Sequence, residues 1–183
     1  MRIFFWIPLF FVLRFSPVNA QNKFTSNNGE IKFASKAQLE LIKAASNKLQ
    51  GILNPTTNQF AFLVNMPSFQ GFNSELQRKH FNENYMESDK FPVAKFSGKV
   101  IEQIDYSQDN VSEVRAKGEL DIHGQKQTRI IKGKITVKGN SVTIEAHFLV
   151  PLSDHNITIP KIVSQKIATE IEVDINSTLV REP

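Results

Sequence analysis

Apolar and polar residues alternate with a period of two along most of the chain after Gly29. From 111 to 122 the even positions are apolar or small and most odd positions are charged. The same alternation runs through 131–137, and after the Lys-Gly-Asn sequence at 138–140 it resumes over 142–150. A period of two indicates half-buried strands, and the short polar connection predicts a hairpin. Shorter segments of this kind occur near 31–33, 49–53, 60–66, 96–100 and 167–175.

These segments amount to about seven or eight antiparallel strands, each with an apolar and a charged face. Strands of this kind, without intervening crossover helices, form a barrel or a sandwich. We predict an all-β, lipocalin-like antiparallel β-barrel of about eight strands. Only 73–86 has a helical period, with Asn73 or Ser74 as the N-cap, and a second short helical turn could form at 39–45.

Three glycines interrupt the apolar faces of the predicted strands: Gly98, Gly118 and Gly133. A glycine at such a position either leaves room inside a barrel or permits a sharp bend of the strand. The pattern alone leaves both possibilities open.

The first twenty residues have the features of a signal peptide. A short basic start precedes an apolar run from Ile3 to Leu13, and Val18-Asn19-Ala20 places small residues where a signal peptidase cuts. The run is too short for a comfortable bilayer span, so we expect no permanent membrane anchor. The predicted organisation is a signal peptide at 1–20 and a single domain at 21–183, located in the periplasm or secreted.

Composition excludes several classes of function. The sequence contains no cysteine, which excludes disulfides, CxxC redox chemistry, thiolate metal sites and lipid attachment through cysteine. The formal charge of +4 falls to +2 once Arg2 and Arg14 are removed with the signal, and the remaining basic residues are scattered. We therefore expect no nucleic-acid partner.

Residues able to do chemistry are present without a recognisable arrangement. The four histidines show no HxH or HExxH spacing, and consecutive side chains in Ser153-Asp154-His155 cannot form a catalytic triad. We predict no catalytic residues, no metal and no cofactor, although the roles of His80 and His123 stay open. A hydrolase that uses the carboxylates Glu83, Glu87 and Asp89 is the least favoured reading.

Phenylalanine is abundant, with fifteen residues in the sequence, and the stretch 80–98 combines aromatic residues with charges. This stretch leaves the predicted helix and re-enters the sheet, so we interpret it as an aromatic lid over one end of a barrel. Two readings of the aromatic residues remain: a packed core, or the wall of a ligand cavity. For the second, the predicted ligand-binding residues are Phe62, Phe69, Phe72, Phe81, Phe96 and Phe148.

Three blocks of the sequence resemble the YceI-like family of exported lipid-binding or polyisoprenoid-binding proteins. They are ELQRKHFNENYMESDKFPVAKFSGKV (75–100), GELDIHGQKQTRIIKGKITV (118–137) and, more weakly, VPLSDHNITIP (150–160). In the third block His155 and Asn156 replace an aromatic residue and a glycine of the family pattern, although asparagine tolerates the left-handed turn. The resemblance implies a lipocalin-like barrel that encloses an isoprenoid or fatty amphiphile and carries no catalytic residues.

Together these observations predict an exported protein that binds a hydrophobic chain-like ligand: a polyisoprenoid, an isoprenoid quinone or a fatty amphiphile. A homodimer is allowed for. The main competing prediction is a structural or stress-related barrel whose interior is filled by its own side chains.

Overall fold

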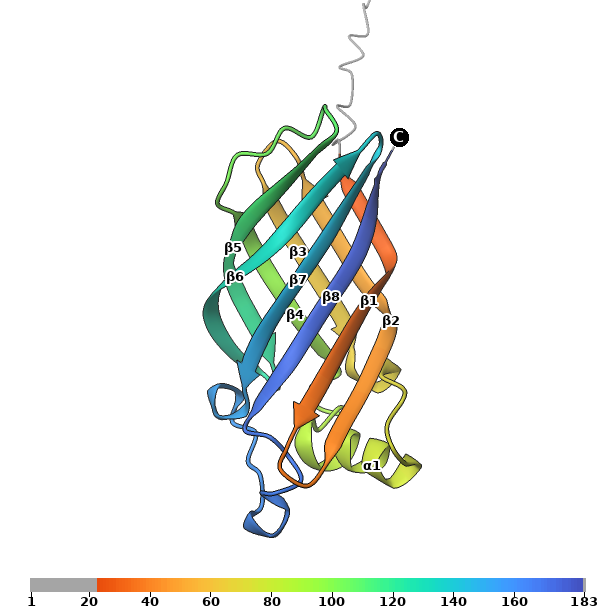
Figure 1. Cartoon of the computed structure of the whole chain (residues 1–183), viewed down its shortest axis with the longest axis vertical. Coiled ribbons are helices and arrows are strands. Elements are labelled where there is room, and N and C mark those ends of the chain that lie inside the picture. The colour runs from red at the N-terminus through yellow and green to blue at the C-terminus, as the bar shows by residue number, and fades with distance from the viewer. Residues whose placement is uncertain (1–22, 183) are drawn as a thin grey trace, which may run out of the picture.

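A computed structural model describes residues 23–182, which form a closed barrel of eight antiparallel strands (Figure 1). The predicted signal peptide, 1–20, lies outside the described residues. The strands are β1 (Phe24–Lys36), β2 (Leu41–Asn54), β3 (Gln59–Asn65), β4 (Val93–Val100), β5 (Asn110–Ile122), β6 (Gln125–Lys138), β7 (Ser141–Pro151) and β8 (Glu170–Arg181).

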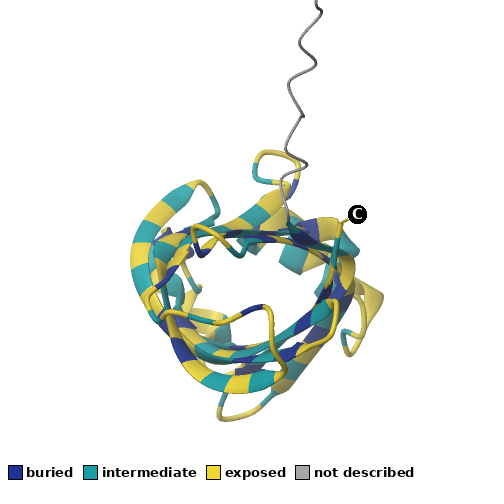
Figure 2. Ribbon diagram, turned by 90° about the horizontal axis from the view of Figure 1, so that it is seen from above, coloured by how far each residue is buried: buried dark blue, intermediate teal, exposed yellow. Residues whose placement is uncertain are grey.

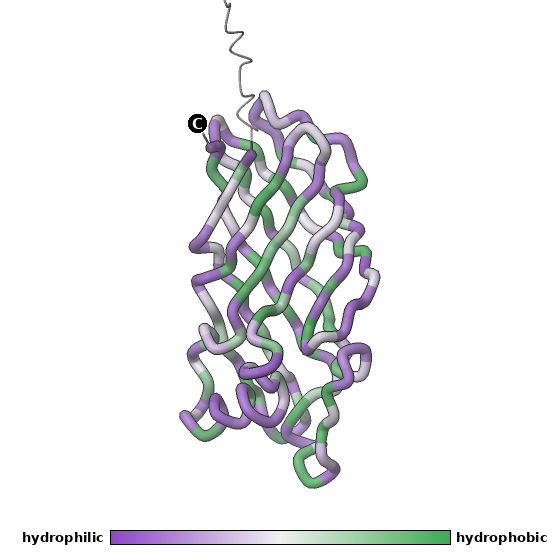
Figure 3. Tube along the Cα trace, turned by 180° about the vertical axis from the view of Figure 1, so that it is seen from behind, coloured by the Kyte–Doolittle hydropathy of each residue, from purple (hydrophilic) through white to green (hydrophobic). Residues whose placement is uncertain are grey.

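Each strand pairs with the next in the sequence, and β8 pairs with β1, so that the sheet has no free edge. The resulting ring is visible along the barrel axis in Figure 2. Hydrophobic and hydrophilic residues alternate along the strands, as the colours of Figure 3 show. The predicted β6–β7 hairpin is confirmed, because Lys138 pairs with Ser141 across Gly139, whose φ is +55°. The predicted all-β barrel is therefore confirmed.

Five short helical segments lie at one end of the barrel or in its connections. They are η1 (Met66–Ser68), α1 (Glu75–His80), the π-helical turn η2 (Phe81–Tyr85), η3 (Leu152–His155) and η4 (Lys161–Val163). Ser74 is the N-cap of α1, and its hydroxyl accepts a hydrogen bond from the Gln77 amide at 3.1 Å. None of the helices formed by residues 23–182 is long and apolar enough to span a membrane.

The helical turn expected at 39–45 is wrong, because β2 already begins at Leu41. Residues in this segment alternate between a buried and an outward side chain: Ala44 and Ser46 are buried, while Leu41 and Lys43 are exposed. The local spacing of apolar residues fits a helix as well as a strand over so few residues, and pairing with β1 decides in favour of the strand.

The two ends of the barrel differ. At the end that carries the termini, Phe24, Leu53, Val142 and Leu179 are fully buried and fill the interior. Tyr106 packs on Phe24 there, with ring centroids 5.9 Å apart. At the other end, α1 and the connections after β3 and β7 lie across the opening (Figure 1). We call these the closed end and the mouth.

The predicted interior glycines allow close approach of strands rather than leaving room. Gly98 of β4 pairs with Gly118 of β5, and a Cβ atom on Gly98 would collide with backbone atoms of Lys117 and Gly118. A Cβ on Gly118 would collide with the Ser97 carbonyl. These positions therefore let β4 and β5 approach closely, which excludes the first predicted role, room inside the barrel, at Gly98 and Gly118. The sharp bend of the strand stays a prediction.

Candidate functional site: a cavity inside the barrel

A cavity of about 460 Å³ occupies the half of the barrel next to the mouth. This volume lies within the range of about 300–1,000 Å³ that is typical of ligand pockets. Its wall is mostly apolar and includes residues from all eight strands except β6 and from the segments at the mouth. The half of the barrel interior next to the mouth is therefore not filled by the protein's own side chains.

All six phenylalanines predicted to bind a ligand line this cavity: Phe62, Phe69, Phe72, Phe81, Phe96 and Phe148. They form two groups at different depths. Phe69, Phe72 and Phe81 lie near the mouth. The Phe81 ring contacts the other two, and all three rings contact Phe33, at centroid distances between 5.1 and 5.9 Å. Their role in ligand binding stays a prediction.

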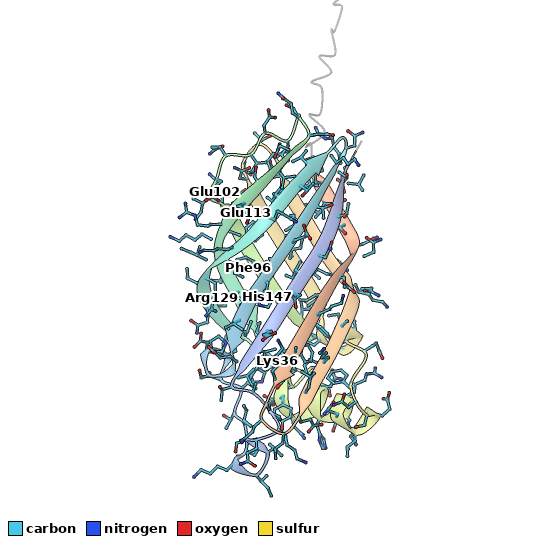
Figure 4. All side chains as sticks on the ribbon, viewed as in Figure 1. Lys36, Phe96, Glu102, Glu113, Arg129 and His147 are labelled. Carbon is cyan, nitrogen blue, oxygen red and sulfur yellow. The ribbon has the colours of Figure 1, made fainter. Side chains whose placement is uncertain are left out.

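The second group forms the floor of the cavity. Phe62, Phe96, Phe148 and Ile175 also line a smaller cavity of about 60 Å³ on the side of the closed end. Phe96 lies about midway along the barrel in Figure 4. On the far side of the floor, Phe60 packs against Phe96 with ring centroids 5.1 Å apart. These rings therefore limit how deeply a chain can enter.

Several lining residues were not among the predicted site residues. Phe33 is central to the mouth group, since its ring stacks on Phe81 at 5.3 Å with an interplanar angle of 17°. Its alternation with Ile31 had already placed both on one face of a strand, and both line the cavity. Met66 and Ile167 belong to the alternating segments 60–66 and 167–175 of the sequence, although they lie just outside β3 and β8.

The aromatic lid is only partly formed by the stretch 80–98. Phe81, Tyr85 and Met86 line the cavity, and burial raises the pKa of the Tyr85 hydroxyl. Phe91 lies elsewhere, because its ring packs edge-on against His123 with centroids 4.7 Å apart. The stretch therefore covers the cavity with Phe81–Met86, packs Phe91 on the β5–β6 turn and continues into β4, where Phe96 lines the cavity.

Polar groups are concentrated at the mouth. The side-chain Nε2 of Gln77 donates to Glu40 Oε1 at 2.9 Å. The backbone amide of Ala168 donates to Ser35 Oγ, also at 2.9 Å. His80 and Lys166 also contribute to this part of the wall. The cavity is thus apolar in depth and polar at its entrance, an arrangement that suits an elongated molecule with one polar end.

The sequence profile of the YceI-like domain matches residues 12–179. This chain belongs to the YceI-like family. The resemblance inferred from the three sequence blocks is therefore confirmed. No curated protein matches the sequence.

Solved structures show that the YceI-like barrel is shared despite low sequence identity. A polyisoprenoid-binding domain from Saccharophagus degradans superposes with a TM-score of 0.69 at 14% identity, covering 88% of this chain and 99% of that one. Burkholderia cenocepacia BcnA gives 0.68 at 14% identity, covering 82% and 95%. The Campylobacter jejuni YceI protein gives 0.56 at 12% identity, covering 100% and 99%. At these identities the likeness establishes the fold.

All three family blocks meet at the β5–β6 turn of this YceI-like barrel. His123 occupies the two-residue β5–β6 turn, where its φ of +53° and that of Gly124, +68°, suit a tight hairpin. His123 Nδ1 donates to the His155 carbonyl at 3.0 Å, and Nε2 faces Glu87 Oε2 at 3.0 Å. The turn thereby joins the lid to the β7–β8 connection.

The turn in the third block, 150–160, forms although His155 and Asn156 depart from the family pattern. Asn156 has a φ of +55°, as its tolerance of the left-handed region predicted. His155 is fully buried, and its Nδ1 donates to the Gln125 carbonyl at 3.1 Å. Its side chain is absent from the cavity wall, so the position that is aromatic in the family does not contact the cavity here.

The carboxylates considered for a hydrolase do not face the cavity. Glu83 lies 4.0 Å from Lys79, and Glu87 binds Lys90 at 2.6 Å; neither these residues nor Asp89 line the wall. Within residues 23–182, no group of three or more His, Asp or Glu side chains is placed to hold a metal ion. His147 is exposed on the outer face of β7, where it pairs with Asp174 at 2.8 Å.

Proposed function

We propose that this YceI-like protein is an exported binding protein, not an enzyme, that encloses one hydrophobic chain-like ligand. The observation that carries the proposal is the apolar cavity of about 460 Å³, open toward a polar mouth. Polyisoprenoids, isoprenoid quinones and fatty amphiphiles share the required shape. The polyisoprenoid-binding domain of Saccharophagus degradans, which has the same fold, lends support to this class.

The affinity expected from such a wall is substantial. Removal of one large apolar side chain from water is worth roughly 1.5–3 kcal/mol, so contacts with three or four rings could supply the roughly 8 kcal/mol of micromolar binding. Specificity among slim chains would be weak, because an apolar wall discriminates one methylene by only about 1–3 kcal/mol. The polar mouth would distinguish headgroups more strongly than the wall distinguishes chains.

The proposed site of action is outside the cytoplasm. The motivation is the signal-peptide pattern of residues 1–20, which predicts a mature chain that begins at Gln21 and resides in the periplasm or is secreted. The intact mass of the exported protein decides this point. A homodimer stays a prediction that native mass spectrometry of the same sample would test.

The binding proposal is tested by native mass spectrometry and organic extraction of the purified protein, followed by uptake of a fluorescent prenyl or fatty probe after lipid removal. Phe81→Ala should weaken probe binding by about tenfold or more, since it removes one ring from the wall. Phe91→Ala is the matched control, because that ring packs on His123 outside the cavity. A stripped protein that folds normally but takes up no probe would disprove the proposal.

A further inference from the structure

Three exposed apolar side chains surround the mouth of the cavity. Ile162 in η4, Leu39 between β1 and β2, and Leu76 in α1 are 92%, 64% and 60% exposed. From their placement, and from the basic residues around them, we propose that the mouth docks on the surface of an anionic lipid bilayer.

Hydrogen bonds join the three segments into one structure. The Leu39 amide donates to the Gln165 carbonyl at 2.8 Å, which connects the β1–β2 turn to the segment that follows η4. On the other side of the turn, Gln77 Nε2 donates to Glu40 at 2.9 Å. We call residues 36–43, 74–80 and 161–167 the mouth rim. Because the β1–β2 turn is hydrogen-bonded to both other segments, the apolar side chains of the rim are held in fixed positions relative to one another.

The apolar surface of the rim is continuous with the cavity wall. Leu76 itself lines the cavity, and Val163, the neighbour of Ile162, lines it as well. The loop around η4 reaches furthest from the barrel and includes hydrophobic positions (Figure 3). Single exposed apolar residues are ordinary on protein surfaces. Here, however, they gather around an opening, whereas others such as Val111 and Ile130 lie on barrel strands.

The charge of the rim favours an anionic surface. Its segments contain six basic residues and two acidic ones: Lys36, Lys43, Arg78, Lys79, Lys161 and Lys166 against Glu40 and Glu75. Lys161 and Lys166 flank Ile162, and neither forms an ion pair with another residue of the described chain. Lys36, the first residue of the rim, lies at the mouth end of the barrel (Figure 4) and pairs with Glu172 at 2.6 Å. Basic residues near an anionic leaflet are attracted to it, and apolar side chains between them insert at the interface.

A bilayer fits this surface better than a folded partner protein does. The apolar side chains are separate points around an opening, and a fluid lipid layer can fill the space between them. Docking in this orientation would place the cavity mouth against the acyl chains. A ligand chain could then pass between bilayer and barrel without crossing water. The docking does not depend on what the cavity holds, so it can be tested apart from ligand binding.

A tryptophan reporter gives the first test. The sequence has one tryptophan, Trp6, inside the predicted signal peptide, so an introduced tryptophan is the only one in a chain that begins at Gln21. Ile162→Trp should show a blue-shifted emission with vesicles of equal parts phosphatidylcholine and phosphatidylglycerol, and less shift with phosphatidylcholine alone. Val111→Trp, at a position 65% exposed on β5, should show no shift. Equal shifts at both positions, or none at 162, would overturn the proposal.

Vesicle flotation gives the second test. The double variant Leu39→Asp/Ile162→Asp should lower the fraction bound to the same anionic vesicles by about tenfold, whereas Val111→Asp should leave it unchanged. Unchanged thermal unfolding shows that the variants fold. Equal flotation of wild type and double variant would contradict the proposal, as would a wild type that does not float but dimerises through the rim. Probe uptake measured on the same samples shows independently whether the cavity still binds its ligand.

Discussion

His123 Nε2 lies 3.0 Å from Glu87 Oε2 and connects the end of the lid to the β5–β6 turn. Glu87 has a φ of +41°, an uncommon value for a residue with a side chain. Its carboxylate also accepts from Lys90 Nζ at 2.6 Å. The hydrogen bond from Lys90, and then that from His123, lower the pKa of Glu87. The part of the lid that covers the cavity, Phe81–Met86, is thus held to the β5–β6 turn by the contact that follows it.

This contact predicts a lid that loosens in acid. Because the folded-state pKa of Glu87 is lowered, its contribution to stability is fully present above its ordinary value of 4.5 and is lost as the pH falls through the lowered value. Protection of the Met86 and Ser88 amides against hydrogen exchange, corrected for intrinsic rates, should therefore fall at low pH. Glu87→Gln should lower it already at neutral pH.

The control for this prediction is Glu83→Gln in the same segment. Glu83 is exposed and lies 4.0 Å from Lys79, so its substitution should leave the protection of these amides unchanged. If Glu87→Gln and Glu83→Gln behave alike, the contact with His123 does not hold the lid.

Tyr106 at the closed end predicts a response to alkali. Burial raises the pKa of its hydroxyl to about 12, and within the described residues this hydroxyl has no hydrogen-bond partner. The stabilising contribution of the neutral form is complete below pH 10 and is lost as the pH rises toward 12. Tyr106→Phe should keep the contact with Phe24 and leave stability at neutral pH unchanged or higher by up to about 1 kcal/mol.

Two measurements check this. The sequence contains two tyrosines, so the difference in tyrosinate absorbance between wild type and Tyr106→Phe isolates the titration of Tyr106. Chemical unfolding at neutral and alkaline pH should show that the variant loses less stability in alkali than the wild type. A titration of Tyr106 near its ordinary value, or a clearly destabilised variant, contradicts the burial of this hydroxyl.

The pairing of Gly98 with Gly118 predicts an intolerant position. Gly98→Ala should destabilise the protein by about 1–3 kcal/mol or more, because the new methyl group meets the backbone of β5 and the strands must move apart. Gly139→Asn is the control, since no atom lies within 4 Å of its Cβ position and asparagine tolerates the positive φ. Urea unfolding measures both. A fully stable Gly98→Ala variant would show that the strands can separate here without cost.

The barrel itself could be predicted from the sequence because period-two alternation is a local signal. Each strand has its own apolar face, and the Lys-Gly-Asn sequence between β6 and β7 predicts their hairpin. The prediction for the segment 39–45 was wrong because a few apolar residues fit a helix and a strand equally well. Only the pairing with β1 decides in favour of the strand. The π-helical turn at Phe81–Tyr85 likewise has no distinct sequence pattern.

The candidate site was predictable to the extent that it lies on strands or in the lid. Phe62, Phe96 and Phe148 line the cavity because they lie on the inner face of barrel strands, whereas Phe69, Phe72 and Phe81 reach it from the segments at the mouth. The contacts of the rim could not be foreseen, since Leu39 and Gln165 are brought together only when β1 closes on β8. The partnership of His123 with Glu87 depends on the pairing of β4 with β5, which brings the segment before β4 next to the turn after β5.

The floor of the cavity predicts a limit on ligand length. Phe148 is one of the floor residues between the cavity of about 460 Å³ and the one of about 60 Å³, so Phe148→Ala should extend the site toward the smaller cavity. In the wild type, affinity for saturated chains should rise by about 0.8 kcal/mol per methylene and then level off when the chain reaches the floor. In the variant the plateau should move to longer chains by at least one methylene.

Phe72→Ala is the matched control, because it removes a ring of the same size at the mouth. It should weaken the binding of all chain lengths by a similar factor and leave the plateau where it is. Both variants should lose stability, by less than the roughly 3–5 kcal/mol of a fully buried phenylalanine, since each ring already borders empty space. Competition of a chain-length series against a fluorescent fatty probe measures the plateau. A plateau at the same length in the wild type and in Phe148→Ala would mean that chains do not extend to these rings, and that the ligand is held near the mouth alone.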